Sequence, residues 1–357
     1  MRLVLIWVFT LLIGFSFSLV KYISPYQAYY LNLLQPFFPL FFFWMFGVVL
    51  YSASKRKVSL LILSLTFTLF NASDLTSYLP TYRGIESSEG QVLVVLSYNT
   101  SFFYAAYQEE DQDEFHYLVE KGRNIKKWIK QQKVDVLCFQ EYYIDSLSNE
   151  FRLDLDLKDY PYQYQMLSSM YTQSGFGGLS IFSKHEIVNE GVVFQGDWKK
   201  YNGAIFTDIK VNSDTVRIIN SHLHSMGLYN PIKTPNPFKT VKTNLNAVRV
   251  GSFIRQKQLK YLNTFVRSSR YPVILSIDMN ETPHSFAYHQ VDAGLSDSFR
   301  RSGTGFGFSL NKGFLKHLRI DYQFYNDKVQ SQKLVTDRTI ELSDHYPLTG
   351  NYLLKED

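Results

Sequence analysis

Long apolar runs fill the first 80 residues, and charged residues interrupt them at only a few points. Leu3–Val20 is 18 residues without a charge, Tyr22–Ser54 is 33 and Val58–Ser73 is 16. A helix rises about 1.5 Å per residue and a bilayer core is about 30 Å thick, so such runs are typical of membrane-spanning helices. We predict a small α-helical transmembrane region over 1–80. The expected spans are 3–20, 33–53 and 58–78.

A basic cluster, Lys55-Arg56-Lys57, separates the second run from the third. Burying one such charge in a bilayer costs about 2.5–3.5 kcal/mol, so two separate spans are favoured over one long span. By the positive-inside rule the cluster stays in the cytoplasm, and the chain after about Thr81 is expected outside it.

Two other interpretations of the apolar runs stay open. The first run could be a signal peptide that begins at Arg2, although it is long and no small-residue cleavage site follows it. All three runs could instead be buried core helices of a soluble protein.

From Gln91 onward, short apolar runs alternate with amphipathic segments, which indicates an α/β domain over 90–357. Tyr117–Gln132 and Val248–Arg267 are predicted helices. Ser225–Asn246 contains three prolines and no clear period, so it is expected to be a long loop of the kind that is often functional. The predicted strands are Val92–Tyr98, Val134–Phe139, Tyr162–Leu167, Leu179–Phe182, Gly191–Phe194, Ala204–Val211, Val216–Asn220, Pro272–Ile277, Arg319–Tyr325 and Leu348–Leu353.

Composition narrows the function classes. Hydrophobic residues make up 45% of the 357 residues, enough for a sizeable core, and the single cysteine, Cys138, excludes an internal disulfide framework. The formal net charge is +5, most of it in the apolar region, so the rest of the chain lacks the strongly basic footprint of a dedicated nucleic-acid binder. The charge is uneven, however, because Thr215–Ile277 holds ten Lys and Arg and no acid.

Polar side chains follow most of the predicted strands. Ligands bind beyond strand ends because side chains converge there. Glu141, Asp344 and Asn99 offer the oxygen atoms that a hard divalent cation prefers. A histidine beside a carboxylate, as in Asp344-His345, can act as acid or base near neutral pH, and Asp321 is a candidate to orient it. The strand-end residues are Asn99, Glu141, His222, Asp278, Asn280, Asp321, Asp344 and His345.

Seven short motifs occur in a fixed order between Gln91 and Leu354: SYNT, FQEY, GLSIFSK, NSHLHS, SIDMNETP, RIDYQF and SDHYPL. Together they resemble the endonuclease/exonuclease/phosphatase superfamily of metal phosphodiesterases, which includes deoxyribonucleases, deadenylases and neutral sphingomyelinases. The resemblance implies a four-layer α/β sandwich, in which two packed mixed β-sheets are flanked by helices. It places the site where the strand ends meet.

The resemblance also implies roles for individual residues. Asn99, Glu141 and Asp344 would hold or position Mg²⁺, or Mn²⁺ in its place.

His222 and Asn280 would contact the scissile phosphate, by the same resemblance. Asp278 would orient or deprotonate the attacking water, and His345, held by Asp321, would act as base or as a charge clamp. The resemblance leaves the choice of base between Asp278 and His345 open.

One position departs from the family pattern Gly-Asp-x-Asn, because Ile277 stands where the glycine is usual. A side chain at that position is expected to narrow the approach to the site or to shift Asp278.

The sequence therefore predicts a membrane-anchored, Mg²⁺-dependent phosphodiesterase, nuclease-like in substrate, with its catalytic domain outside the cytoplasm. A lipid-headgroup phosphodiesterase of the sphingomyelinase or phospholipase C type is an alternative, because the spans would hold the site near the bilayer. A catalytically dead, membrane-anchored binding module is a third. A phosphoinositide phosphatase is disfavoured, since the Trp- and Arg-bearing motifs of that group are absent around Asp278 and Asp344. The residues expected to rest on anionic headgroups are Lys233, Phe238, Lys239, Lys242 and Arg249.

Overall fold

A computed structural model of the chain describes residues 2–80, 90–105, 112–170, 174–196, 201–225, 235–313 and 316–355. Two six-stranded sheets form its centre, and each sheet is mixed because it contains one parallel pair among antiparallel ones. The first sheet has the order β11-β12-β1-β2-β4-β3. Its strands are β1 (Val92–Asn99), β2 (Val136–Asp145), β3 (Tyr162–Ser169), β4 (Gly175–Ser183), β11 (Val329–Thr336) and β12 (Leu348–Leu354).

The second sheet has the order β5-β6-β7-β8-β10-β9. Its parallel pair aligns His222 with Asp278, and the antiparallel neighbour of β8 places Asp321 opposite Asp278. The strands are β5 (Ile187–Gln195), β6 (Gly203–Val211), β7 (Asp214–His222), β8 (Val273–Asp278), β9 (Ser296–Asp297) and β10 (Asp321–Tyr325).

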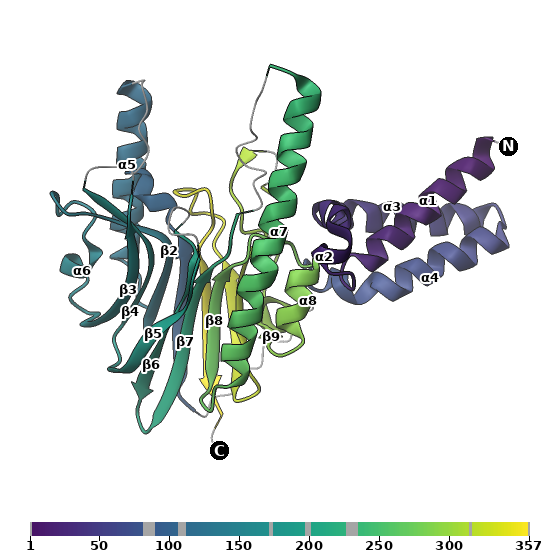
Figure 1. Cartoon of the computed structure of the whole chain (residues 1–357). Helices are drawn as coiled ribbons and strands as arrows, with labels where there is room; N and C mark the ends of the chain where they lie inside the picture. Colours follow the sequence, from purple (N-terminus) through teal and green to yellow (C-terminus); the bar gives the residue numbers. More distant parts are fainter. Residues whose placement is uncertain are drawn as a thin grey trace.

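Helices cover the outer faces of both sheets, which completes the predicted four-layer sandwich (Figure 1). An apolar core between the sheets includes Val95, Ile218 and Ile274. A second core lies under α7 and α8, and a third lies under α5. The helices of this domain are α5 (Gln112–Ile129), α6 (Leu153–Asp156), α7 (Pro237–Arg267), α8 (Phe286–Asp292) and α9 (Ser298–Ser302), with the 3-10 helix η2 (Ser101–Tyr104).

Helix α7 begins at Pro237 and not at Val248, so the prediction of a loop reaching Asn246 is wrong for that part. The Asn236 side chain accepts hydrogen bonds from the backbone N–H groups of Phe238 and Lys239. Proline at the first helical position has a φ already suited to a helix. The same proline that suggested a loop therefore starts the helix, and residues 226–234, with Lys233, lie outside the described residues.

The apolar N-terminal segment forms helices beside the sandwich (Figure 1). Pro25–Ser54 and Val58–Leu75 are each long and apolar enough to cross a bilayer, judged by length and composition among the described residues; Trp7–Leu19 is a shorter apolar helix. The elements are α1 (Arg2–Leu19), α2 (Pro25–Ala28), the 3-10 helix η1 (Tyr29–Phe37), α3 (Phe38–Ser54) and α4 (Val58–Leu75).

Candidate active site

The site lies at the end of the sandwich where the parallel pairs of both sheets terminate. Register explains the convergence: Asn99 at the end of β1 pairs with Gln140 of β2, and His222 at the end of β7 pairs with Asp278 of β8. Asp321 at the start of antiparallel β10 reaches the same end. Asp344 and His345 precede β12, which runs antiparallel to β1. The structure thus brings all eight predicted site residues to one end of the fold.

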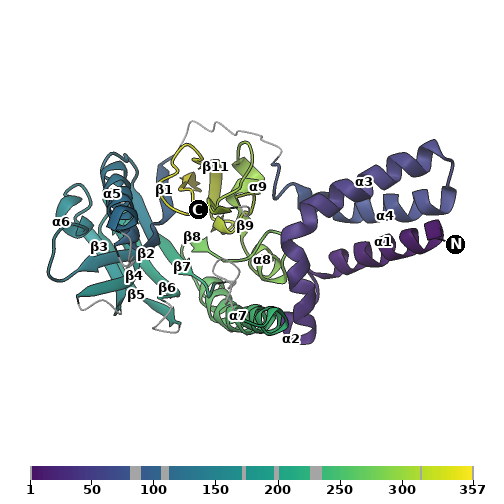
Figure 2. The same ribbon diagram turned by 90° about the horizontal axis from the view of Figure 1, so that it is seen from above.

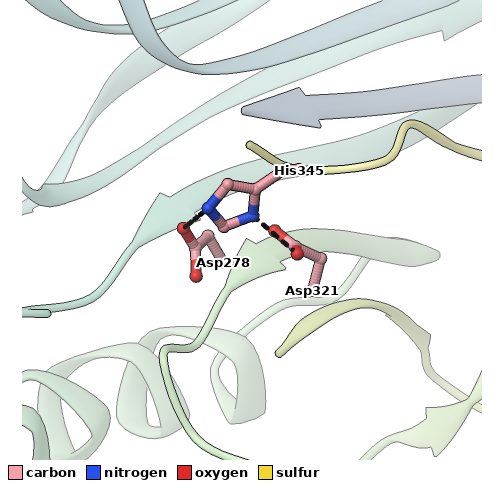
Figure 3. Close-up of side chains that lie close together, drawn as sticks. All are labelled: Asp278, Asp321 and His345. Carbon is pink, nitrogen blue, oxygen red and sulfur yellow. Dashed lines mark hydrogen bonds and ion pairs between the residues drawn. The ribbon is translucent and has the colours of Figure 1, made fainter. Parts of the chain in front are cut away.

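His345 lies between two carboxylates (Figure 3). Its Nδ1 is 2.8 Å from Asp321 Oδ2, and its Nε2 is 3.9 Å from Asp278 Oδ2. Burial alone would disfavour the charged ring, but attraction to Asp321 and Asp278 raises the pKa of His345 well above its usual range. The two carboxylates therefore favour the protonated ring, in which Nδ1–H would point to Asp321.

Asp278 is the residue on which the other polar groups converge. Asn99 Nδ2 donates to Asp278 Oδ2 at 3.0 Å, and His222 Nε2 lies 3.6 Å from the same oxygen. Burial and then repulsion from Asp321 raise the pKa of Asp278 well above its usual range. Burial and then the charge of His345 lower the pKa of His222 to about 3, so this ring is neutral and its contact with Asp278 is not an ion pair.

Glu141 and Asp344 form the second part of the site. Burial and then the charge of Asp344 raise the pKa of Glu141 to about 7. Burial would raise the pKa of Asp344 too, but the charge of His345 and the hydroxyl of Ser101 lower it. The raised pKa of Glu141 beside the charge of Asp344 fits a hard divalent cation, which would relieve the repulsion on Glu141 and prefers oxygen ligands.

A second group of side chains also has the composition of a metal site. One ligand atom each of Asp278, Asp321 and His345 lies within 4.8 Å of the others, and all three residues are buried. The His345 Nδ1 in this group already contacts Asp321 Oδ2 at 2.8 Å, so that nitrogen is not open to a cation. Glu141 with Asp344 therefore suits a cation better than the group around His345.

Two site residues have a left-handed backbone, with φ 48° at Glu141 and φ 54° at Asn280. Non-glycine residues adopt this conformation at a cost, and such strain gathers at functional sites. Asn280 is held there by its N–H, which donates to Asp278 Oδ1 at 3.1 Å, and by its Nδ2, which donates to the Leu223 carbonyl at 3.1 Å.

Ile277 does not line the site, so the expectation that it narrows the approach is wrong. Its side chain is fully buried in the core with Leu259 of α7 and Ala287 of α8. Successive side chains of a strand point to opposite faces, so Asp278 faces the site while Ile277 faces the helices.

Sequence reasoning missed several polar neighbours of the predicted residues. Ser101 donates to Asn99 Oδ1 from its backbone at 3.0 Å and to Asp344 from its hydroxyl. Lys312 Nζ lies 3.7 Å from Asp344 Oδ2, and the Ser343 hydroxyl donates to the Asn99 carbonyl. Ser343 begins the motif SDHYPL and Ser101 directly follows SYNT, so their positions beside these motifs could have identified them. Lys312 lies in none of the motifs.

The two-sheet sandwich with this buried carboxylate and histidine cluster defines a metal-dependent hydrolase of phosphate esters. The Endonuclease/Exonuclease/phosphatase family matches residues 96–345, more than half of the chain, and the chain belongs to that family. No curated protein matches it.

Solved structures share the fold at low sequence identity. An endonuclease/exonuclease/phosphatase from Beutenbergia cavernae superposes with a TM-score of 0.54 at 17% identity, covering 74% of this chain and 72% of that one. A functionally unknown conserved protein from Enterococcus faecalis has a TM-score of 0.50 at 17% identity, covering 74% and 100%. The family protein from Bacteroides vulgatus has a TM-score of 0.50 at 14% identity, with the same coverage.

Proposed function

We propose that this chain is a membrane-anchored, Mg²⁺-dependent phosphodiesterase with nuclease-like chemistry. The observation that carries the proposal is the arrangement around Asp278. Asn99, His222 and His345 surround one of its oxygens at 3.0, 3.6 and 3.9 Å.

Asp278 is the better general base of the two candidates. Burial lowers the pKa of His345, but the charges of Asp321 and Asp278 raise it well above its usual range, which makes the ring the poorer proton acceptor of the two. A carboxylate with a raised pKa is a stronger base than an ordinary one, and burial and then repulsion from Asp321 raise the pKa of Asp278. We assign His345 to stabilising negative charge on the phosphate oxygens, and Asn99 to orienting Asp278. Neutral His222 and Asn280 would contact the phosphate.

Glu141 and Asp344 would hold the cation, with Asn99 close by. When bound, Mg²⁺ would supply positive charge to the phosphate oxygens. Lys312 near Asp344, at 3.7 Å, would add to the positive potential on that side.

Exposed apolar side chains on the N-terminal helices support membrane anchoring. Phe9, Phe43 and Leu69 are 65%, 55% and 67% exposed, which a core helix of a soluble protein would not show. With the helices in a bilayer, the basic cluster 55–57 favours a cytoplasmic α3–α4 turn and an extracytoplasmic catalytic domain.

A second candidate substrate is a lipid headgroup, and helix α7 favours it. The helix runs crosswise to α1, α3 and α4 (Figures 1 and 2), so it would lie along the surface of a bilayer that those helices cross. Its N-terminal part exposes Phe238 at 88% and Val241 at 57%, beside Lys239 and Lys242. Apolar side chains flanked by cations are typical of helices at anionic membrane surfaces.

The basic segment Thr215–Ile277 supports a nucleic-acid substrate less strongly than its number of Lys and Arg residues suggests. Arg217 is paired with Asp208 at 2.7 Å, and Arg255 is buried against Glu281 at 2.7 Å. Neither cation is available for a phosphate backbone.

The decisive experiment uses the full chain in detergent micelles. Mg²⁺-dependent hydrolysis of bis(p-nitrophenyl) phosphate, plasmid DNA and sphingomyelin vesicles would be measured side by side, with Glu141→Gln as the matched control. Turnover that the substitution abolishes supports the proposal, and the preferred substrate decides between nucleic acid and lipid. Turnover that survives in Glu141→Gln, or none on any substrate, would contradict it.

A further inference from the structure

The loop after β8 is buried along its whole length, from Met279 to Ser285. Loops normally lie at the surface, because a buried loop must satisfy its backbone polar groups without water. This loop follows Asp278 directly and contains Asn280, so its position sets the position of both. What buries it is the N-terminal helical segment, which lies against this side of the sandwich (Figure 2).

Gln35 of η1 makes the most direct contact with the loop. Its Oε1 accepts from the Thr282 backbone N–H at 2.8 Å and from the Thr282 hydroxyl at 3.2 Å. Its Nε2 donates to Glu281 Oε2, and Asn32 Nδ2 donates to Glu281 Oε1 at 3.2 Å. Gln35 and Asn32 are 2% and 5% exposed, so water cannot replace either amide.

The other end of the loop is tied to the apolar helices themselves. His284 contacts the Phe17 carbonyl of α1 through Nε2 at 2.7 Å. Its Nδ1 lies 3.0 Å from Asp74 of α4, which also pairs with Lys21 at 2.7 Å. The Phe38 ring of α3 stacks on the His284 ring at 3.7 Å. One histidine of the loop thus contacts three helices of the segment.

A buried ion pair between Glu281 and Arg255 connects the β8 loop to the end of strand β7. Arg255 Nε of α7 donates to Glu281 Oε1 at 2.7 Å, and its Nη1 donates to the His224 and Ser225 carbonyls at 2.8 and 2.9 Å. His222 lies two residues before His224. The helical segment, the β8 loop and the end of β7 therefore form one hydrogen-bonded unit.

We propose that the N-terminal helical segment is a positioning element of the active site, and that Gln35 is its main positioning residue. Gln35 holds Glu281-Thr282, which fixes the left-handed backbone at Asn280 and the direction of Asp278. This inference rests on the proposed phosphodiesterase function for its kinetic readout. It makes the helices part of the catalytic apparatus as well as an anchor.

The first test is Gln35→Met in the full chain, assayed on bis(p-nitrophenyl) phosphate with Mg²⁺. Methionine keeps the volume and removes both hydrogen-bonding groups. Misplacement of a catalytic group by about 1 Å can lower a rate about 100-fold, so kcat is expected to fall by about that factor. KM and the Mg²⁺ midpoint are expected to change less than about threefold, because Gln35 touches neither substrate nor the carboxylates assigned to the metal.

A charge substitution at Gln35 separates positioning from packing. Gln35→Glu keeps the size of the side chain, sets a carboxylate against Glu281 and is expected to lose at least as much kcat as Gln35→Met. Substitution of Glu281 itself is avoided, because it would also break the buried ion pair with Arg255. Wild-type kcat in Gln35→Glu, with the variant folded, would contradict a specific contact.

Asn71→Ala is the matched control. Asn71 is buried in α4 and donates to Ser18 at 2.8 Å and to the Phe67 carbonyl, all within the helical segment. It is expected to keep wild-type kcat. Equal loss in Asn71→Ala and Gln35→Met would overturn the inference, because activity would then follow the integrity of the bundle. Wild-type kcat in Gln35→Met would overturn it directly.

Hydrogen exchange distinguishes failure of this inference from failure of the proposed function. Peptides covering Met279–Ser285 are expected to exchange faster in Gln35→Met than in the wild type or in Asn71→Ala. This readout needs no substrate. If the wild type hydrolyses nothing but the exchange difference is present, the proposed function fails and the positioning contact stands. If turnover is present and exchange is unchanged, the positioning inference fails alone.

Discussion

The Nδ1 atom of His345 lies 2.8 Å from Oδ2 of Asp321, and both residues are buried at the end of the sandwich. This contact orients the ring so that its Nε2 faces Asp278. Burial lowers the pKa of the His345 ring, and attraction to Asp321 is the largest effect that raises it. In the proposed mechanism, His345 would stabilise negative charge on the phosphate oxygens and Asp278 would accept a proton.

Asp321→Asn is expected to lower kcat at neutral pH, because it removes the strongest attraction that raises the pKa of His345. With a lower pKa, the His345 ring loses its proton at a lower pH. The pH above which activity falls should therefore be lower in Asp321→Asn than in the wild type. His345→Ala is expected to lose about 10²–10⁴-fold in kcat at all pH values. A pH–rate profile from pH 5 to 9 measures both. An unshifted profile in Asp321→Asn would contradict the assigned role.

Glu141→Gln is expected to have opposite effects on stability with and without metal. Without metal the substitution removes a carboxylate whose charge is disfavoured by burial and then by Asp344, so the melting temperature should rise. With Mg²⁺ the wild type should gain about 2.7 kcal/mol at 100 times its Kd, and the variant should gain little. Thermal unfolding in EDTA and across a Mg²⁺ titration tests this. Equal Mg²⁺-induced shifts in both proteins would exclude Glu141 as a ligand.

The strands that carry the site were predictable because their buried runs are continuous and each ends in a polar residue. Val92–Tyr98 and Pro272–Ile277 match β1 and β8 to within a residue at each end. The α7 start was not predictable from periodicity, because its first turns project beyond the core and carry no buried stripe. The β11 strand was missed because only some of its side chains are buried.

The contact between Gln35 and the β8 loop could not be predicted from sequence. Gln35 stands 246 residues from Glu281 in the chain, inside an apolar run with no motif around it. A glutamine in such a run indicates only that a polar partner exists. Which partner it meets depends on how the helices dock against the sandwich. The contacts among Asp74, Lys21 and His284 depend on the same docking and were not predictable either.

Two buried histidines are expected to destabilise the fold as the pH falls. Burial lowers the pKa of His222 to about 3, with help from the charge of His345, and lowers that of His289 to about 4. Both values lie below the unfolded value of about 6.5, so the unfolded chain binds more protons below that pH. Each group should remove about 1.4 kcal/mol of stability per pH unit between about 6.5 and its folded pKa.

Melting temperatures at pH 7.5, 6.5, 5.5 and 5.0 would measure this acid sensitivity. His289→Gln should reduce the slope below pH 6.5, because one of the two titrating groups is removed. His116→Gln on the exposed face of α5 is the matched control and should leave the slope unchanged. A slope that His289→Gln does not alter would contradict the assignment.

The orientation of α7 relative to a bilayer can be measured with cysteine-directed spin labels. Cys138, the single native cysteine, is fully buried, and burial raises the pKa of its thiol to about 12, so it should not react. Labels at Phe238→Cys and Val241→Cys, in full chain reconstituted with anionic lipid, are expected to be accessible to oxygen and shielded from a water-soluble nickel complex. Tyr162→Cys on β3, at the far side of the sandwich from the bundle (Figure 2), should show the reverse.

If the substrate is a lipid headgroup, the exposed apolar side chains at the start of α7 should affect hydrolysis in vesicles but not hydrolysis of a soluble substrate. Phe238→Ser together with Val241→Ser should leave hydrolysis of bis(p-nitrophenyl) phosphate unchanged, because both side chains are exposed and outside the site. Hydrolysis of sphingomyelin in vesicles should fall about tenfold or more, since burying a phenylalanine in an apolar phase contributes about 1.5–3 kcal/mol. Equal rates on vesicles, with Phe238 and Val241 labels exposed to the nickel complex, would place α7 in water and remove the support for a lipid substrate.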